Sequence, residues 1–119
     1  MYGLPDGFDG SFFLDRVLEF VSFSANTLNL DFDNSVSLTI ESSYEYKWAD
    51  DVGAIESQQV PVSSSRLMGL IGGKVLSVGV EDGGTLVLNF DSGTVFRCFD
   101  DQSHYESYRI AHGGEEIYI

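Results

Sequence analysis

Few residues in this chain have the type and spacing that enzyme catalysis requires. The single cysteine, Cys98, lies in the apolar run 95–99, and His104 and His112 are the only histidines. A serine or cysteine triad would therefore have to use one of these two histidines, and no Gly-x-Ser-x-Gly motif marks a nucleophile. A free cysteine in an apolar segment behaves as a small hydrophobic residue. We expect Cys98 to be a buried thiol, and we expect the protein to have no catalytic residues and not to be an enzyme.

Metal and phosphate sites find equally little support in the spacing of the polar residues. Residues 69–75 look superficially like a phosphate loop, but Val75 stands where such a loop needs Ser or Thr to bind magnesium. Residues 31–34 alternate oxygen ligands without the glycine and the distant glutamate of a calcium loop. His104 and Glu106 have the His-x-Glu spacing of zinc deaminases, yet one cysteine cannot supply the Cys-x-x-Cys ligands. The sequence therefore predicts no metal site and no cofactor.

Aromatic residues beside carboxylates form the one group that suits binding. Tyr44, Tyr46 and Trp48 are two residues apart, so they share one face of a strand. Large aromatic side chains with a hydroxyl or indole group next to carboxylates are typical of hot spots that contact basic protein partners. The alternative is that these aromatic residues cover the core edge of the sheet. The predicted partner-binding residues are Tyr44, Tyr46, Trp48, Asp50, Asp51, Asp100, Asp101, Tyr105, Glu106 and Tyr108.

The charge balance of the chain restricts the kinds of partner it can bind. Nineteen acidic residues against six basic ones give a net charge of −13 and a pI near 4.1. Such a field repels phosphates and anionic lipid headgroups, and it attracts basic surfaces. We therefore expect no binding to nucleic acid or to a membrane, and we expect a basic protein as the partner. The alternative is that the acidity serves only solubility.

The sequence has the features of a cytoplasmic protein. Residues 1–6 lack the basic and apolar segments of a signal peptide. No apolar stretch approaches the roughly 18 residues of a membrane span. One cysteine allows no disulfide within the chain, which fits a reducing compartment.

The elements that must position these residues are mainly β-strands. Apolar and polar residues alternate over 28–32 and over 36–40, which is typical of half-buried strands. Residues 33–35 and 91–93 are of types that tolerate tight turns. A short helix is expected over 63–72 and a helical turn over 10–15. The other strands are expected at 17–23, 43–48, 75–80, 86–90, 95–99, 104–110 and 115–119.

An internal repeat organises the chain. Residues 16–34 align without a gap on residues 74–92, matching Phe32 with Phe90 and Asp33 with Asp91. In this alignment Phe20 corresponds to the apolar Val78. We expect a single domain over residues 1–119, built of two similar halves at about 10–48 and 66–110 and joined by a loop at 49–62. The halves can pair within one chain or swap between two, so a monomer and a homodimer both remain open.

The expected fold class is mainly β, or β-rich α+β. Two related antiparallel β-meander halves form a sandwich or a half-open barrel, with one or two short helices. At 119 residues the chain can bury one hydrophobic core without a disulfide or a metal. The predicted core residues are Leu28, Leu30, Phe32, Leu38, Ile40, Val75, Val78, Leu86, Leu88, Phe90 and Phe96.

Three segments carry a resemblance to known proteins. The chain resembles a family of small, acidic, uncharacterised bacterial proteins. The segments that carry the resemblance are residues 70–75, residues 86–93, and residues 99–101 with 104–108. Proteins of this size and acidity are similar to immunity proteins of polymorphic or contact-dependent toxin systems. The motifs are structural, so the resemblance implies no catalytic residue.

The resemblance implies a function as an immunity-type binding protein. Such a protein would neutralise a basic toxin, expected to be a nuclease, through an acidic surface, because a nuclease active site must itself be positive to hold phosphates. The alternative is a non-enzymatic β-module with an unknown ligand or a role in self-association.

Overall fold

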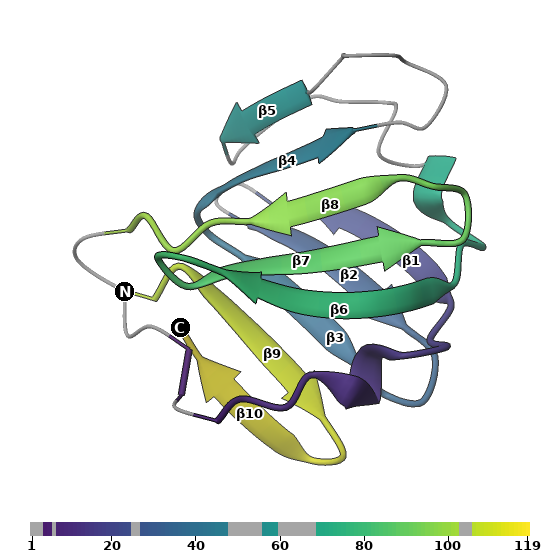
Figure 1. Ribbon diagram of the computed structural model, residues 1–119, viewed down its shortest axis with the longest axis horizontal. Helices are drawn as coiled ribbons and strands as arrows, with labels where there is room; N and C mark the ends of the chain where they lie inside the picture. Colours follow the sequence, from purple (N-terminus) through teal and green to yellow (C-terminus); the bar gives the residue numbers. More distant parts are fainter. Residues whose placement is uncertain (1–3, 6, 25–26, 48–55, 60–68, 103–105) are drawn as a thin grey trace.

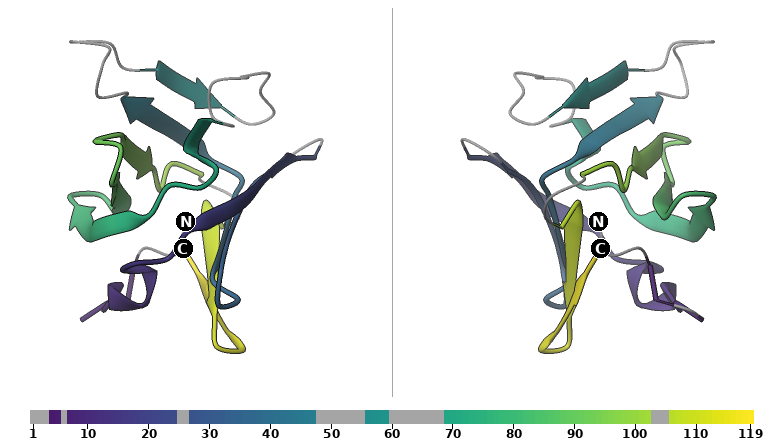
Figure 2. Two further views of the ribbon diagram at one scale, coloured as in Figure 1. Left: turned by 90° about the vertical axis from the view of Figure 1, so that its right-hand side faces the viewer. Right: turned by 90° about the vertical axis from the view of Figure 1, so that its left-hand side faces the viewer.

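The protein is an open sandwich of two antiparallel β-sheets. A computed structural model describes residues 4–5, 7–24, 27–47, 56–59, 69–102 and 106–119. Its elements are η1 (Ser11–Phe13), β1 (Leu18–Phe23), β2 (Leu28–Phe32), β3 (Ser37–Ile40), β4 (Ser43–Lys47), β5 (Glu56–Gln59), β6 (Val75–Glu81), β7 (Thr85–Phe90), β8 (Val95–Cys98), β9 (Tyr108–His112) and β10 (Glu115–Tyr118). One sheet has the order β1-β2-β3-β9-β10 and the other β5-β4-β8-β7-β6 (Figure 1). Figure 2 shows the two sheets facing each other without closing into a barrel, which confirms the predicted β-sandwich.

The fourth strand of each half crosses to the opposite sheet. β1, β2 and β3 form one antiparallel meander, and β6, β7 and β8 form a second one, as the alternating sequence predicts. β4 then pairs with β8, and β9 pairs with β3. Each sheet is therefore completed by a strand from the other half, an exchange that the hydrophobic pattern does not reveal.

Strand β5 lies inside the segment that the sequence predicts to be a loop. It pairs with β4, with Ser43 opposite Gln59 and Tyr46 opposite Glu56. Its four residues, Glu-Ser-Gln-Gln, contain no apolar side chain. No alternation of apolar and polar residues could therefore signal this strand in the sequence.

The gapless alignment of the two halves is wrong by one residue in the first strand. Phe32 and Phe90 are equivalent, but Phe32 pairs with Leu18 whereas Phe90 pairs with Val75. The difference arises at the turns, because two residues separate Ser24 from its partner Thr27, whereas three separate Glu81 from its partner Thr85. The structural counterpart of Phe20 is thus Ser77, not Val78: Phe20 pairs with Asp31 and Ser77 with the equivalent Asn89.

The two halves meet through a symmetric set of backbone contacts. An isolated bridge joins Val17 to Lys74. The Oδ1 atoms of the repeated aspartates, Asp33 and Asp91, accept hydrogen bonds from the N–H groups of Val17 (3.0 Å) and Lys74 (3.2 Å). These carboxylates satisfy backbone donors at the two strand starts, which explains why aspartate occurs at both positions of the repeat.

The core between the sheets contains the residues that the alternation predicts. All eleven predicted core residues are buried except Val78, which is partly buried and packs against the core. The rings of Phe32 and Phe90 stack between the halves with centroids 6.4 Å apart. Cys98 is a buried free thiol, as expected, and burial raises its pKa well above the usual value.

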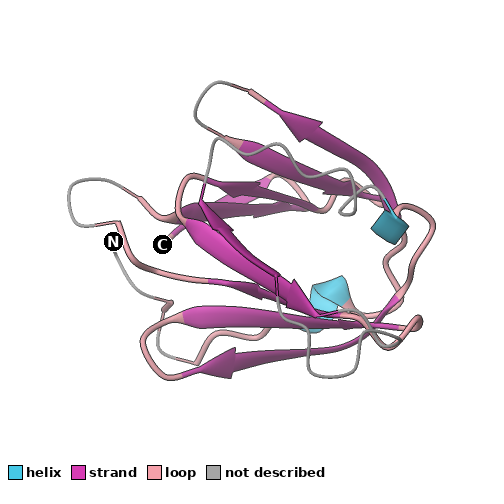
Figure 3. Ribbon diagram, turned by 90° about the horizontal axis from the view of Figure 1, so that it is seen from above, coloured by secondary structure: helices cyan, strands magenta, loops and turns pink. Residues whose placement is uncertain are grey.

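Helical structure is limited to short turns in the described part of the chain (Figure 3). η1 lies within the helical turn predicted for 10–15. Gly69 and Leu70 adopt the same 3-10 conformation, and residues 63–68 of the predicted helix lie outside the described residues. β9 occupies Tyr108–His112, two residues beyond the predicted end of its strand. The N–H of the buried Ser107, just before β9, instead bonds to the carbonyl of Ile119.

Candidate binding groove

The three predicted aromatic contact residues that the structure describes lie in the core. Tyr44, Tyr46 and Tyr108 are each 0% exposed, and the ring of Tyr44 stacks on Phe96 with centroids 5.6 Å apart. Burial raises the pKa of the Tyr44 and Tyr108 hydroxyls, and the Tyr108 hydroxyl donates a hydrogen bond to the carbonyl of Gly84 (2.7 Å). These three tyrosines therefore pack in the core of the folded chain, as the alternative interpretation expects.

Two of the predicted acidic residues have structural partners. Asp100 accepts a 2.6 Å hydrogen bond from the Ser107 hydroxyl. Asp101 accepts hydrogen bonds from the backbone N–H of Ser43 (3.2 Å) and from the Ser43 hydroxyl. These contacts hold the segment before β9 against the start of β4, so both carboxylates stabilise the strand exchange.

The predicted residue Glu106 lies close enough to Glu41 to affect its pKa. Partial burial and repulsion from Glu106 raise the pKa of Glu41, while the positive charge of Arg109 lowers it. Glu106 therefore lies among charged neighbours at the start of β9. The residues outside the described part of the chain are Trp48, Asp50, Asp51 and Tyr105.

A concavity of about 480 Å³ lies beside the start of β1 and the β2–β3 turn. Its lining includes three carboxylates, from Glu19, Asp31 and Asp33, and the side chain of Phe20. Phe20 is 66% exposed, the largest exposed fraction among the large hydrophobic residues described. We call this concavity the acidic groove; it is lined by Glu19, Phe20, Asp31, Phe32, Asp33, Asn34, Ser35, Val36 and Ser37.

A β-bulge explains why an apolar ring is exposed here. The register of β1 on β2 shifts between Leu18 and Phe20. A bulge inserts an extra residue and redirects the side chains that follow it, so Glu19 and Phe20 are both exposed between the buried Leu18 and Val21. Sequence reasoning missed Phe20 because the gapless repeat paired it with an apolar residue of the core. A signal was available in the pair Phe20–Val21, because these two consecutive apolar residues interrupt the strict alternation.

The carboxylates of the acidic groove make a single ion pair within the described part of the chain. Among the described residues, neither Glu19 nor Asp31 forms an ion pair. Asp33 lies 3.7 Å from Nη1 of Arg16.

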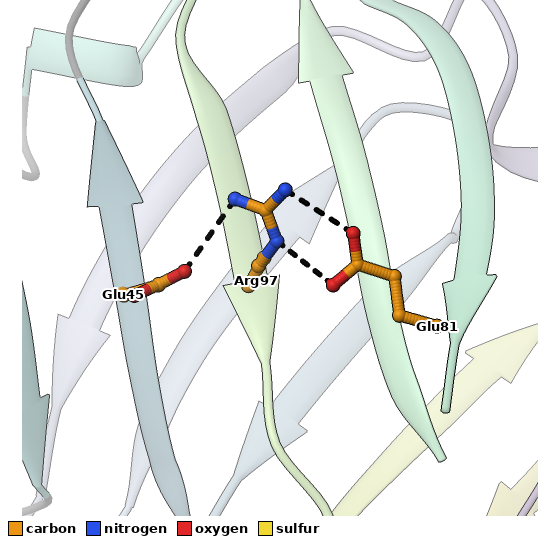
Figure 4. Close-up of polar contacts among 3 residues, drawn as sticks. All are labelled: Glu45, Glu81 and Arg97. Carbon is orange, nitrogen blue, oxygen red and sulfur yellow. Dashed lines mark hydrogen bonds and ion pairs between the residues drawn. The ribbon is translucent and has the colours of Figure 1, made fainter. Parts of the chain in front are cut away.

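The opposite sheet has a different arrangement of charge. Arg97 on β8 donates hydrogen bonds to both carboxylate oxygens of Glu81 (3.0 and 3.2 Å) and to Glu45 (3.4 Å) (Figure 4). The hydrogen bond from Arg97 lowers the pKa of Glu81. The two carboxylates that flank Arg97 are thus neutralised within the molecule, whereas Glu19 and Asp31 have no ion pair with any residue that the structure describes.

A second cavity of about 340 Å³ adjoins the acidic groove, and Asn34 and Val36 line both. We call it the η1 cavity; it is lined by Ser11, Phe12, Leu14, Arg16, Asn34, Val36, His112 and Gly113. The Phe12 ring stacks on the His112 imidazole, with centroids 3.7 Å apart and planes inclined by 8°.

The turn between the two cavities has an unusual backbone. Asn34 and Ser35 have φ values of 55° and 59°, in the left-handed region. The equivalent turn of the other half uses Gly93 at a φ of 86°. A serine in this region carries strain that glycine avoids, and such strain is concentrated at functional sites.

Metal binding and membrane spanning find no support in the described residues. They contain no group of three or more His, Cys, Asp or Glu side chains that could hold a metal ion. The same residues include no helix that is long and apolar enough to cross a bilayer.

The described residues form an open β-sandwich with an acidic concavity on its surface. A family model described as a family of unknown function, DUF6188, matches residues 12–119. The chain therefore belongs to this family. Searches of curated proteins and of solved structures each returned no match.

Proposed function

We propose that the protein acts without catalysis, by binding a basic protein partner in the acidic groove. The observation that supports this proposal is the exposed Phe20 ring beside the carboxylates of Glu19, Asp31 and Asp33. An exposed aromatic ring surrounded by carboxylates is complementary to an Arg or Lys side chain. Its aliphatic stem can pack on the ring while its charge meets the carboxylates.

The energetics favour such a partner in two ways. Burying a phenylalanine side chain is worth about 1.5–3 kcal/mol, enough for Phe20 to act as an anchor. The net charge of −13 would speed association with a basic surface, and this gain would fall as salt is added.

We further propose that the partner is a toxin and the protein its immunity-type inhibitor, acting in the cytoplasm. The acidity of the chain and its resemblance to small bacterial immunity proteins support this proposal. A nuclease toxin suits it best, because its active site must be positively charged to hold nucleic-acid phosphates. An inhibitor with an unneutralised acidic groove would compete for that surface.

The test is co-expression with the product of the neighbouring reading frame, followed by calorimetry of the purified complex. Phe20→Ala should weaken binding by about 30-fold, or ~2 kcal/mol. The matched control is Leu76→Ala, which truncates another exposed apolar side chain (57% exposed) on the other sheet. Equal affinities for the Phe20 and Leu76 variants would contradict the placement of the interface.

Charge variants test the electrostatic part of the proposal. Glu19→Gln combined with Asp31→Asn should lower the association rate and flatten its dependence on salt. The control, Asp82→Asn combined with Glu115→Gln, removes the same charge from exposed turn and strand-end positions. If both double variants change the rate equally, net charge alone steers association and the groove has no special role.

Self-association is a second candidate function, favoured by the edge strand β6. Leu76 and Val80 on this strand are 57% and 51% exposed, and exposed apolar edge strands are prone to pair with other chains. Light scattering at high salt should then show a dimer that Leu76→Glu converts to a monomer. A monomer at all salt concentrations would remove this candidate.

A further inference from the structure

We infer that the η1 cavity is a binding subsite for a carboxylate group attached to an apolar or aromatic body. The inference rests on the residues of this cavity and does not require the proposed function. None of its eight lining residues is acidic, although the chain contains 19 acidic residues. The cavity is thus a local exception to the charge of the molecule.

Three side chains with N–H donors line this cavity from three separate elements. Arg16 precedes β1, Asn34 lies in the β2–β3 turn and His112 ends β9. A guanidinium binds a carboxylate with two parallel hydrogen bonds, and an amide and an imidazole can donate to the same group. Three donors converging on one concavity are the arrangement that a carboxylate requires.

The Arg16 side chain is held in place but keeps donors for a ligand. Its Nε donates to the carbonyl of Leu14 (3.3 Å), which fixes the direction of the guanidinium. Oδ1 of Asp33, the ion-pair partner of Arg16 among the described residues, is 3.7 Å from Nη1, beyond hydrogen-bond length. Oδ1 of Asp33 already accepts the N–H of Val17. A ligand carboxylate can therefore bind Arg16 without displacing a strong ion pair.

His112 is positioned by aromatic stacking on Phe12. Among the described residues, His112 has a carboxylate neighbour in Glu115, whose Oε2 is 3.7 Å from Nε2 and whose side chain is 77% exposed. A solvent-exposed carboxylate at this distance is a weak competitor.

The apolar part of the cavity would receive the body of the ligand. Phe12, Leu14 and Val36 line it, and the exposed fraction of Leu14 is 39%. A volume of about 340 Å³ accommodates a single aromatic ring with its carboxylate.

Benzoate is the probe that tests the subsite, and benzamide is its neutral control of the same shape. In ¹H–¹⁵N NMR titrations of the full chain, benzoate should shift the Asn34 and Gly113 amide signals with a Kd on the order of 1 mM. Benzamide should bind at least 10-fold more weakly. Equal shifts with the two compounds would show that the carboxylate is not recognised and would overturn the inference.

Variants assign the binding to named side chains. Arg16→Gln should weaken benzoate binding at least 10-fold, and Arg109→Gln, on the outer face of β9, should not. Asn34→Asp, which keeps the side-chain shape and tolerates a positive φ, should also weaken it and serves if Arg16→Gln fails to fold. Unchanged benzoate affinity in either folded variant of the cavity would overturn the inference. Phe20→Ala should leave benzoate binding unchanged, so a failure of the acidic groove and a failure of this subsite are distinguishable.

Discussion

Glu41 shows how single charges adjust the stability of this acidic molecule. It lies between β3 and β4, and its N–H donates to the carbonyl of Ser107. Partial burial and the Glu106 carboxylate raise its pKa above the usual value. The folded state therefore holds the Glu41 proton more tightly than the unfolded state does.

This shift predicts a pH-dependent effect of Glu41→Gln. A carboxyl whose pKa is raised on folding costs no stability below its unfolded-state pKa, and its cost grows as pH rises to the folded-state pKa. The variant should therefore have a higher Tm than the native protein at about pH 7 and nearly the same Tm at about pH 3. Thermal unfolding followed by circular dichroism measures both. Equal effects at the two pH values would show that the carboxylate charge is not the cause; Glu115→Gln, at a 77% exposed side chain, is the control.

The exposure of three residues, Tyr44, Tyr46 and Phe20, could not be predicted from the sequence. Spacing correctly places Tyr44 and Tyr46 on one face of a strand, but it cannot tell which face the opposite sheet covers. β4 lies between β5 and β8, and the facing sheet covers the side that carries these two tyrosines. The exposure of Phe20 is also not predictable from the sequence. The alternation and the repeat predict a buried side chain, whereas the β-bulge exposes it.

Among the elements, the β2–β3 and β7–β8 turns show the clearest divergence between the halves. Both connect equivalent strands with the same register, Leu30 with Leu38 and Leu88 with Phe96. Ser35 nevertheless has a φ of 59° where the other half has Gly93 at 86°. A serine at this φ is less favourable than glycine by about 1 kcal/mol.

The two turns therefore predict opposite effects of reciprocal substitutions. Ser35→Gly should raise the free energy of unfolding by about 1 kcal/mol, and Gly93→Ser should lower it by a similar amount, as measured by urea denaturation. Ser35 lines the acidic groove, so the stabilised variant also shows whether partner binding depends on this backbone. Destabilisation by Ser35→Gly would mean that the serine side chain compensates for the strain.

The sequence predicts most of the strands and hairpins of this fold. Alternation finds the strands around the core and turn chemistry finds the hairpins, because both depend on neighbouring residues. β5 is missed because it has no apolar residue, and the one-residue difference between the β1–β2 and β6–β7 turns is missed because a gapless alignment cannot contain it.

The whole molecule depends on contacts between its halves. β4 pairs with β8 and β9 with β3, so the fourth strand of each half lies in the sheet that contains the meander of the other half. Long-range pairing of this kind leaves no local signal, which is why the sequence predicts the two meanders but not how they combine.

The exchange predicts that separated halves will fold only together. Fragments 1–59 and 60–119 should each give a poorly dispersed NMR spectrum at low micromolar concentration, and an equimolar mixture should recover the dispersed spectrum of the intact chain. A dispersed spectrum from either fragment alone at that concentration would contradict this expectation.

The crossed β4 and β9 also suggest how such a protein can arise. A chain of half this length, pairing with a copy of itself through the same two contacts, would build this sandwich as a symmetric homodimer. Fusing the two genes replaces an assembly that depends on concentration with an intramolecular one, and it frees each copy to change independently. In this chain the first half carries Phe20 and the acidic groove, while the second carries Ser77 at the matching position and Arg97, which pairs with Glu45 and Glu81.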